Sequence, residues 1–194
     1  MRSMTSDEAR KWCSQGAIGL TLTRNDTLRY RSPGEHKFFV TAPEEHRDIV
    51  FLARHILSFR GEAVFGGGLL WLRRWDIGSP QLVRVGWRIL EDIRRAHGES
   101  RSLEVAPAQL FRDDEFVELH AFLVQTIAFG WVADYIPSSG GFFAHFKDNR
   151  QVRLSAESLE TSKEMRSSFH EWNPTHEDPM VAKMALMRKA RLAK

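Results

Sequence analysis

Three side chains in the last third of the chain could carry out acid–base chemistry if the fold brings them together. Asp134 and Tyr135 are adjacent, and His145 follows after the Ser- and Gly-rich loop 137–141. Apolar residues on both sides of this loop predict two antiparallel strands, so the carboxylate and the imidazole could lie close together. Strand alternation places Asp134 and Tyr135 on opposite faces, however. We therefore take Asp134, Tyr135 and His145 as weak candidates for a catalytic site.

The same part of the chain is rich in aromatic and basic side chains that could form a binding surface. The candidate binding residues are Trp131, Tyr135, Phe143, Lys147 and Arg150, with Arg153 close by. Trp, Tyr and Arg are favoured anchors of protein interfaces, and aromatic rings beside cations can also stack on single-stranded nucleic acid. The competing explanation is that these rings fill the core, because thirteen phenylalanines and six tryptophans must mostly lie inside.

Other motifs with chemical potential are incomplete. His170 and His176 are six residues apart, and Pro174 prevents the continuous helical face that a zinc-protease motif requires. The glycines of 66–68 lack the Gly-Lys-Ser/Thr of a phosphate-binding loop and instead predict a close approach of two backbone segments or a tight bend. Cys13, the single cysteine, has no accompanying base and fits a small buried hydrophobic residue. We expect neither a metal nor a cofactor.

Basic charge is concentrated at the C-terminus. The formal net charge is +3, and residues 180–194 alone contribute +5. Methionines recur in this segment at helical spacing, at positions 180, 184 and 187. Such a helix could bind a groove of a partner, an acidic membrane surface or nucleic acid, or pack on its own domain or on a second copy of the chain. We favour packing on self or on a twin subunit, and keep nucleic-acid binding through this tail as an alternative.

The overall composition is typical of a globular protein, with 42% hydrophobic and 27% charged residues. Residues 1–9 contain no apolar signal core, and no stretch approaches the ~18–20 apolar residues that span a bilayer. A cytoplasmic location is the default expectation. With no repeat and no low-complexity segment, we expect one domain over 1–178 and a basic helical tail over 179–194.

Helix signals are clearest at the two ends of residues 80–97. Ser79 and Pro80 suit the N-cap and first position, and Gly98 can close the helix in a left-handed conformation. The predicted solvent face holds Arg84, Arg88, Glu91 and Arg95. Thr5 and Glu8 have the spacing of a capping box at the start of an earlier helix.

These elements predict an α+β fold. Helices are expected over 43–59, 80–97 and 113–129, and hairpins near 28–40 and 131–154. Together they indicate a single antiparallel, or mixed, sheet of about five to seven strands with three or four helices on one face.

Residues 131–154 therefore carry the functional hypotheses. The leading one is a non-enzymatic binding module that recognises a protein partner or a second copy of the chain. The alternative is a small enzyme. A contiguous patch of exposed aromatic rings would favour binding, whereas an enzyme should show Asp134, Tyr135 and His145 opening into one enclosed pocket.

Overall fold

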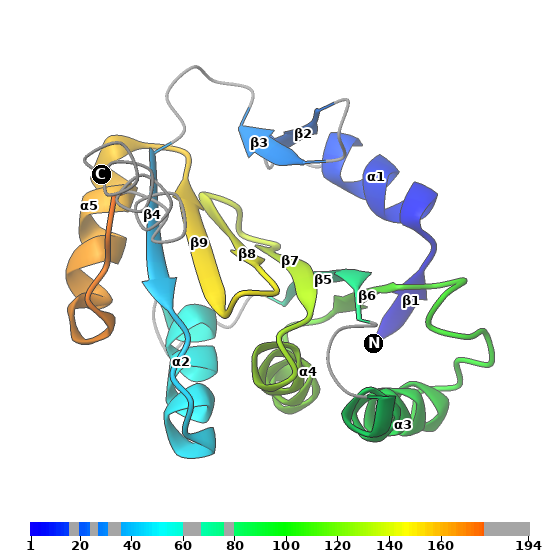
Figure 1. The fold of residues 1–194 in the computed structure, drawn as a ribbon. Coiled ribbons are helices and arrows are strands. Elements are labelled where there is room, and N and C mark those ends of the chain that lie inside the picture. Colours follow the sequence, from blue (N-terminus) through cyan, green and yellow to red (C-terminus); the bar gives the residue numbers. More distant parts are fainter. Residues whose placement is uncertain (16–19, 24–26, 31–35, 60–66, 76–79, 177–194) are drawn as a thin grey trace, which may run out of the picture.

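A seven-stranded antiparallel sheet forms the centre of the molecule, in the order β1-β6-β5-β7-β8-β9-β4 (Figure 1). The computed structural model describes residues 1–15, 20–23, 27–30, 36–59, 67–75 and 80–176. The strands are β1 (Arg2–Met4), β4 (His36–Thr41), β5 (Gly68–Arg74), β6 (Ala108–Phe111), β7 (Val132–Pro137), β8 (Phe142–Phe146) and β9 (Gln151–Ala156). A separate two-stranded sheet pairs β2 (Leu20–Leu22) with β3 (Leu28–Tyr30).

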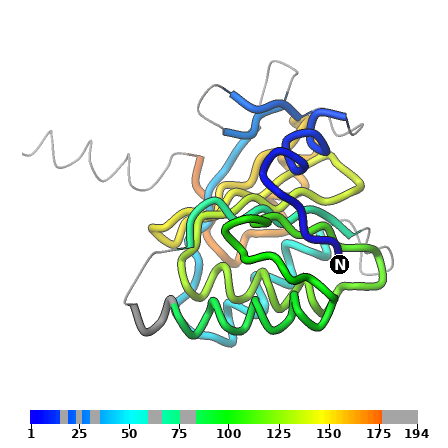
Figure 2. Tube along the Cα trace, turned by 90° about the vertical axis from the view of Figure 1, so that its right-hand side faces the viewer, coloured from blue at the N-terminus to red at the C-terminus, as the bar shows by residue number. Residues whose placement is uncertain are grey.

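Helices lie on both faces of this sheet. They are α1 (Ser6–Gln15), α2 (His46–Ser58), α3 (Pro80–Ala96), α4 (Phe116–Ala128), α5 (Leu159–Ser168) and the short 3-10 helix η1 (His170–Trp172). Figures 1 and 2 show α2, α3 and α4 on one side, with α1 and the small sheet on the other. The predicted α+β fold, with one antiparallel sheet and helices packed on it, is confirmed. The predicted helical tail 179–194 lies outside the described residues.

Two cores result from strict alternation along the strands. Leu70 and Leu72 of β5 pack in the larger core with α2 and α4, whereas Leu69 and Trp71 pack in a smaller core. The smaller core is closed by Ala9, Cys13, Leu20 and Leu28, which come from α1 and the small sheet. This second layer covers only part of its face of the sheet, because no residue of β9 or β4 belongs to the smaller core.

The predicted hairpin over 28–40 is wrong. Residues 28–30 pair with β2, whereas β4 pairs along its whole length with β9. Without β4, β9 would expose a row of unpaired backbone groups beside buried apolar side chains. Long-range pairing therefore prevails over the nearer partner. The meander predicted near 131–154 is present, as β7, β8 and β9 in antiparallel order.

Glycines 67 and 68 permit the close approach that their sequence predicted. A Cβ atom on Gly68 would lie 2.7 Å from the carbonyl oxygen of Ile136, and one on Gly67 would lie 2.3 Å from that of Phe111. Gly67 also has a φ of +56°. These two residues let β5 start tightly between β6 and β7, while position 66 lies outside the described residues.

The helix α3 buries Glu91, which was expected on its solvent face, together with Arg94. Glu91 and Arg94 are both buried, and Arg94 Nη1 donates a 2.9 Å hydrogen bond to Glu91 Oε1. The same carboxylate oxygen accepts the N–H of Leu103, and Arg94 Nη2 donates to the carbonyl oxygen of Ala106. The pair therefore satisfies backbone groups of the irregular segment that follows the helix, which periodicity alone does not reveal. Gly98, at φ +79°, closes α3 as predicted, while Ser79 lies outside the described residues.

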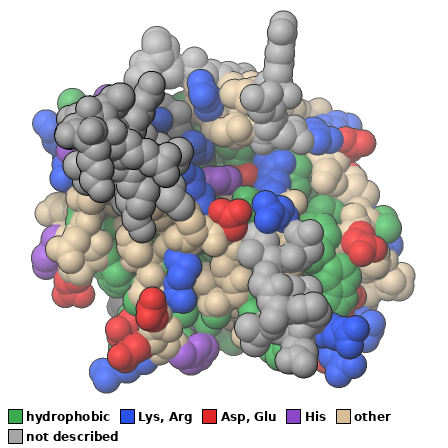
Figure 3. Space-filling view, in the orientation of Figure 1, with side chains coloured by type: hydrophobic (Ala, Val, Ile, Leu, Met, Phe, Trp, Pro, Cys, Tyr) green, Lys and Arg blue, Asp and Glu red, His purple; other side chains and the backbone are tan. Residues whose placement is uncertain are grey.

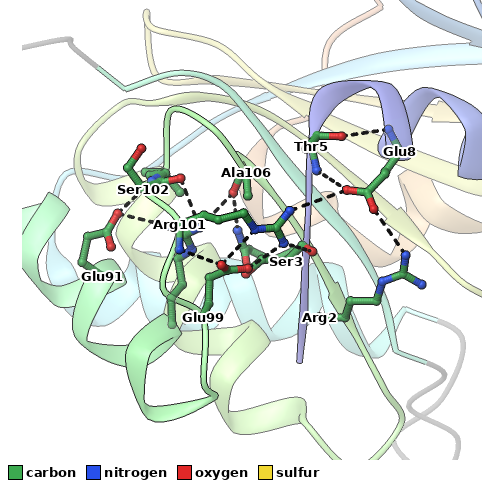
Figure 4. A network of polar contacts seen from close by, with 12 residues as sticks. Arg2, Ser3, Thr5, Glu8, Glu91, Glu99, Arg101, Ser102 and Ala106 are labelled. Carbon is green, nitrogen blue, oxygen red and sulfur yellow. Dashed lines mark hydrogen bonds and ion pairs between the residues drawn. The ribbon is translucent and has the colours of Figure 1, made fainter.

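A surface network continues from this segment to the N-terminal strand (Figure 4). Arg101 Nη2 donates to the carbonyl oxygen of Ser3 and to Glu99. Hydrogen bonding to Arg101 lowers the pKa of Glu99 to about 2. Thr5 and Glu8 form the predicted capping box, with Thr5 N–H donating to Glu8 and Glu8 N–H donating to Thr5. The network fixes β1 at the edge of the sheet.

Candidate functional site

The candidate site is a lateral row of side chains that crosses five neighbouring strands. The residues that face one another in register are Trp71, Asp134, His145, Arg153 and Phe39, on β5, β7, β8, β9 and β4. The adjacent row consists of Leu72, Ala133, Phe146, Val152 and Val40, all of which belong to the larger core. Because side chains alternate, the row that contains Asp134 projects from the opposite face of the sheet, away from α2 and α4.

The centre of the row is a hydrogen-bonded carboxylate–imidazole pair. Asp134 Oδ1 lies 2.8 Å from His145 Nδ1. The other oxygen of Asp134 accepts a 2.8 Å hydrogen bond from Arg73 Nε. The Asp134 side chain is 3% exposed, whereas that of His145 is 21% exposed. A buried carboxylate thus holds one nitrogen of a histidine that reaches the surface.

A strand irregularity places Arg73 in this arrangement. The register between β5 and β7 shifts between Leu72 and Arg74, which leaves Arg73 at a bulge. Its guanidinium carbon lies 3.2 Å from the centroid of the Trp71 ring. The ring and the bulge together direct Arg73 Nε towards the carboxylate of the next strand.

Charges around Asp134 outweigh its burial. Burial by itself raises the pKa of this carboxyl, but the hydrogen bond and charge of His145, together with the charge of Arg73, lower it below its ordinary value. Asp134 is therefore ionised at neutral pH. With an ionised acceptor, His145 Nδ1 carries the proton of the hydrogen bond, so the neutral ring presents a lone pair on Nε2.

Cys13 lies close enough to feel the same charges. Burial raises the pKa of its thiol to about 12, with a further contribution from the charge of Asp134. A thiol that stays protonated is a poor nucleophile. The structure thus places Cys13 in the smaller core, as its sequence context predicted, and a cysteine–histidine mechanism has no support here.

Of the three catalytic candidates, the structure brings together Asp134 and His145 but not Tyr135. The Tyr135 side chain is 1% exposed and packs in the larger core against Phe142. Burial raises the pKa of its phenol. Alternation had already placed Tyr135 on the opposite face from Asp134, and the observed register agrees with that expectation.

The aromatic members of the candidate binding set are in the cores. Trp131 stacks on Phe129 in the larger core, and Phe143 packs against Tyr30 in the smaller one. Trp131, Tyr135 and Phe143 are all buried. A binding role for residues 131–154 would therefore depend on their basic members.

Those basic members are held at the margin of the sheet. Lys147 Nζ lies 5.2 Å from the centroid of the Phe39 ring. Arg150 Nη2 donates to the carbonyl oxygen of Pro43. Both side chains are half-buried, so they contribute positive charge next to the row without projecting freely from it.

Sequence patterns did not connect Arg73 or Arg153 with the pair. Arg73 follows a buried apolar run, and only the bulge brings it to Asp134. Arg153 is opposite His145 because β9 pairs with β8 in one particular register. The space-filling view shows basic, acidic and histidine side chains close together near the centre of one face (Figure 3), although Asp134 itself, at 3% exposure, contributes little to that surface.

A larger hollow lies away from this row, between α2 and η1. It has a volume of about 690 Å³ and is lined by Pro43, Asp48, Phe51, Arg54, His55, Ser58, Glu171 and Trp172. His55 Nε2 lies 3.3 Å from the hydroxyl oxygen of Ser168, and burial lowers the pKa of this histidine. Its ring is enclosed by Phe169 and Trp172. We give greater weight to the Asp134 row, since it combines a buried charge with an oriented imidazole.

Within the described part of the chain, no group of three or more His, Cys, Asp or Glu side chains could hold a metal ion. The described helices also include none with the length and apolar character needed to cross a membrane. Comparisons with protein-family models, curated proteins and solved structures gave no match.

Proposed function

We propose that the protein is a small enzyme in which His145 acts as a general base and then a general acid, with Asp134 as its positioning residue. The observation that carries this proposal is the buried Asp134 carboxylate, which bridges Arg73 Nε and His145 Nδ1 at 2.8 Å each. A carboxylate in this position fixes the orientation and the tautomer of the imidazole.

The exposure of the two side chains supports a directional role. Asp134 is almost inaccessible, whereas His145 keeps about a fifth of its side chain exposed. Nδ1 of the ring is engaged by the carboxylate, so a substrate would meet the ring at Nε2. There the imidazole can take a proton from a hydroxyl group or a water molecule, and return it to a leaving group in a later step.

Electrostatics would favour this proton transfer. An ionised Asp134 stabilises the imidazolium that forms when Nε2 accepts a proton. Arg73 balances the charge of Asp134 in the resting state and keeps the carboxylate from being protonated in its place. The carboxylate of Asp134 therefore remains ionised and available as the acceptor for His145 Nδ1.

Turnover of simple chromogenic substrates tests the proposal. We would measure hydrolysis of 4-nitrophenyl acetate and 4-nitrophenyl phosphate by the unaltered chain and by His145→Gln, with the exposed His46→Gln as the matched control. General acid–base catalysis contributes roughly 10²–10⁴-fold, and His145→Gln should lose a rate factor of that order. Turnover that survives in His145→Gln, or that is absent with both substrates, would count against the proposal.

Asp134→Asn separates a positioning role from a purely structural one. It should lower kcat with little change in KM, because the neutral amide can no longer stabilise the imidazolium. An equal loss of activity and of folded protein would instead identify Asp134 as a residue needed only for stability.

A further inference from the structure

We infer that Arg153 binds an oxyanion, a phosphate or carboxylate group, of the molecule on which His145 acts, an assignment that rests on the proposed function for its link to catalysis. Arg153 stands directly opposite His145 in the β8–β9 register. Side chains in that relation have Cβ atoms roughly 4.5–5.5 Å apart. One ligand could therefore contact both.

The hydrogen-bonding state of Arg153 points to a missing acceptor. Its Nε and Nη2 atoms are buried, and neither has a hydrogen-bond partner in the part of the chain that the structure describes. These two nitrogens form one edge of the guanidinium plane, whose N–H groups point in the same direction. That edge matches the two oxygens of a carboxylate or phosphate.

A comparison within the molecule shows that this state is unusual. Arg94 also has an unbonded Nε, but its other two nitrogens donate to Glu91 and to the carbonyl oxygen of Ala106. Arg150 likewise leaves Nε unbonded while Nη2 donates to a backbone carbonyl. Arg153 has no such bond among the described residues. An unsatisfied buried donor is destabilising. Arg94 and Arg150 offset this cost with hydrogen bonds inside the chain, whereas Arg153 would need a bound acceptor to do so.

Packing also prepares Arg153 for a ligand. Its guanidinium carbon lies 5.5 Å from the centroid of the Phe143 ring, and Phe143 is itself buried against Tyr30. On the other side, Arg153 faces the buried Phe39 of β4. Apolar walls on both sides reduce the local dielectric constant, which strengthens an interaction between the guanidinium and an anion.

The charge balance of the row supports an anion over a cation. Asp134, the acidic residue of the row, is already engaged by Arg73 and His145. Arg153 therefore adds a positive charge that no carboxylate of the row balances. A phosphate or carboxylate group would neutralise this charge. The bond to be cleaved, or the proton to be removed, in the same molecule would then lie towards Nε2 of His145.

Binding of inorganic phosphate to the whole chain at pH 7 tests this inference. Isothermal titration calorimetry should detect binding, and Arg153→Met should weaken it at least tenfold. Arg153→Lys keeps the charge but cannot form the bidentate hydrogen bond, so it should weaken phosphate binding less than Arg153→Met does. The control Arg95→Met removes an exposed arginine of α3 and should bind as the unaltered chain does. Phosphate binding that is absent, or unaffected by Arg153→Met in a folded variant, would overturn the inference.

The same titration with acetate in place of phosphate identifies the preferred group. The anion that binds more tightly indicates whether the substrate carries a carboxylate or a phosphate. Kinetics then separate this inference from the proposed catalysis. Arg153→Met should raise KM for 4-nitrophenyl phosphate by a larger factor than KM for the neutral 4-nitrophenyl acetate. Arg153-dependent phosphate binding without His145-dependent turnover would sustain the oxyanion site and reject the enzyme. His145-dependent turnover with an unchanged KM in Arg153→Met would sustain the enzyme and reject the oxyanion site.

Discussion

Replacing Asp134 by Asn should reveal how much stability the buried carboxylate contributes. The substitution preserves shape but removes the charge that both neighbours use. Asp134 accepts hydrogen bonds from Arg73 and His145 at 2.8 Å each. An amide has one oxygen in place of two, and its NH₂ group would face a donor. At least one of the two neighbours would therefore lose its partner.

The size of the effect follows from burial. Removing one partner of a buried ion pair costs about 3–5 kcal/mol. The side chains of Arg73 and His145 are 15% and 21% exposed, so water can replace part of the lost interaction. We expect the lower end of the range, about 3 kcal/mol. In a domain of this size, each kcal/mol lowers Tm by about 2–4 °C, which predicts a Tm about 6–12 °C lower.

Urea unfolding at several pH values checks both the size and the cause. The pKa of Asp134 in the folded chain lies below its ordinary value of 3.8. Its contribution is therefore fully present above that value and is lost as the pH falls through the folded pKa. The gap between the unaltered chain and Asp134→Asn should be wide at pH 7 and should narrow below about pH 4.

A matched control is Asp148→Asn, whose carboxylate is 48% exposed and lies 3.5 Å from Arg74. Exposed pairs of this kind contribute about 0–1 kcal/mol, so this variant should unfold close to the unaltered chain. A gap for Asp134→Asn below 1 kcal/mol at pH 7, or one that stays constant down to pH 3, would refute the reasoning.

Three further outcomes follow from other buried features. Glu91→Gln takes the carboxylate from the buried Arg94 and should cost about 3–5 kcal/mol in urea unfolding; Asp92→Asn, on a carboxylate that is 74% exposed, should cost far less, and equal costs would contradict the assignment. Gly68→Ala would place a carbon 2.7 Å from a carbonyl oxygen of β7, so we expect a loss of about 1–3 kcal/mol in thermal unfolding, and an unchanged Tm would speak against the close approach. Cys13, whose thiol pKa is about 12, should resist a disulfide exchange reagent at pH 8 until urea unfolds the chain, and prompt labelling of the folded protein would contradict its burial.

Local pattern predicted the parts of the fold that depend on neighbours in the chain. The meander over 131–154 followed from alternation and from turn residues, and its register places Asp134 beside His145. Gly98 and the capping box of Thr5 and Glu8 are set by one helical turn of sequence. Such features need no knowledge of distant partners, so sequence alone was sufficient.

Features that depend on distant partners were missed or misassigned. Residues 36–41 pair with β9, more than a hundred positions away, and not with the nearby 28–30. Glu91 is buried because the N–H of Leu103 and the guanidinium of Arg94 need its carboxylate. Helical periodicity identifies a charged residue as exposed by default, since it has no information about which backbone groups remain unsatisfied nearby.

Alternation also explains why the aromatic hypothesis and the acid–base hypothesis diverge. On each strand of the meander, one parity enters the larger core and the other projects from the opposite face. Tyr135 shares the core parity, whereas Asp134, His145 and Arg153 share the other. Part of that other face is closed by α1 and the small sheet, which bury Phe143. The polar residues of the row then lie beside the smaller core and not within it, while Phe39 in the same row is buried. In this position Asp134 is buried and His145 is partly exposed. Arg153 has two buried nitrogens that lack a hydrogen-bond acceptor among the described residues, which is the state expected of a residue that binds an anion.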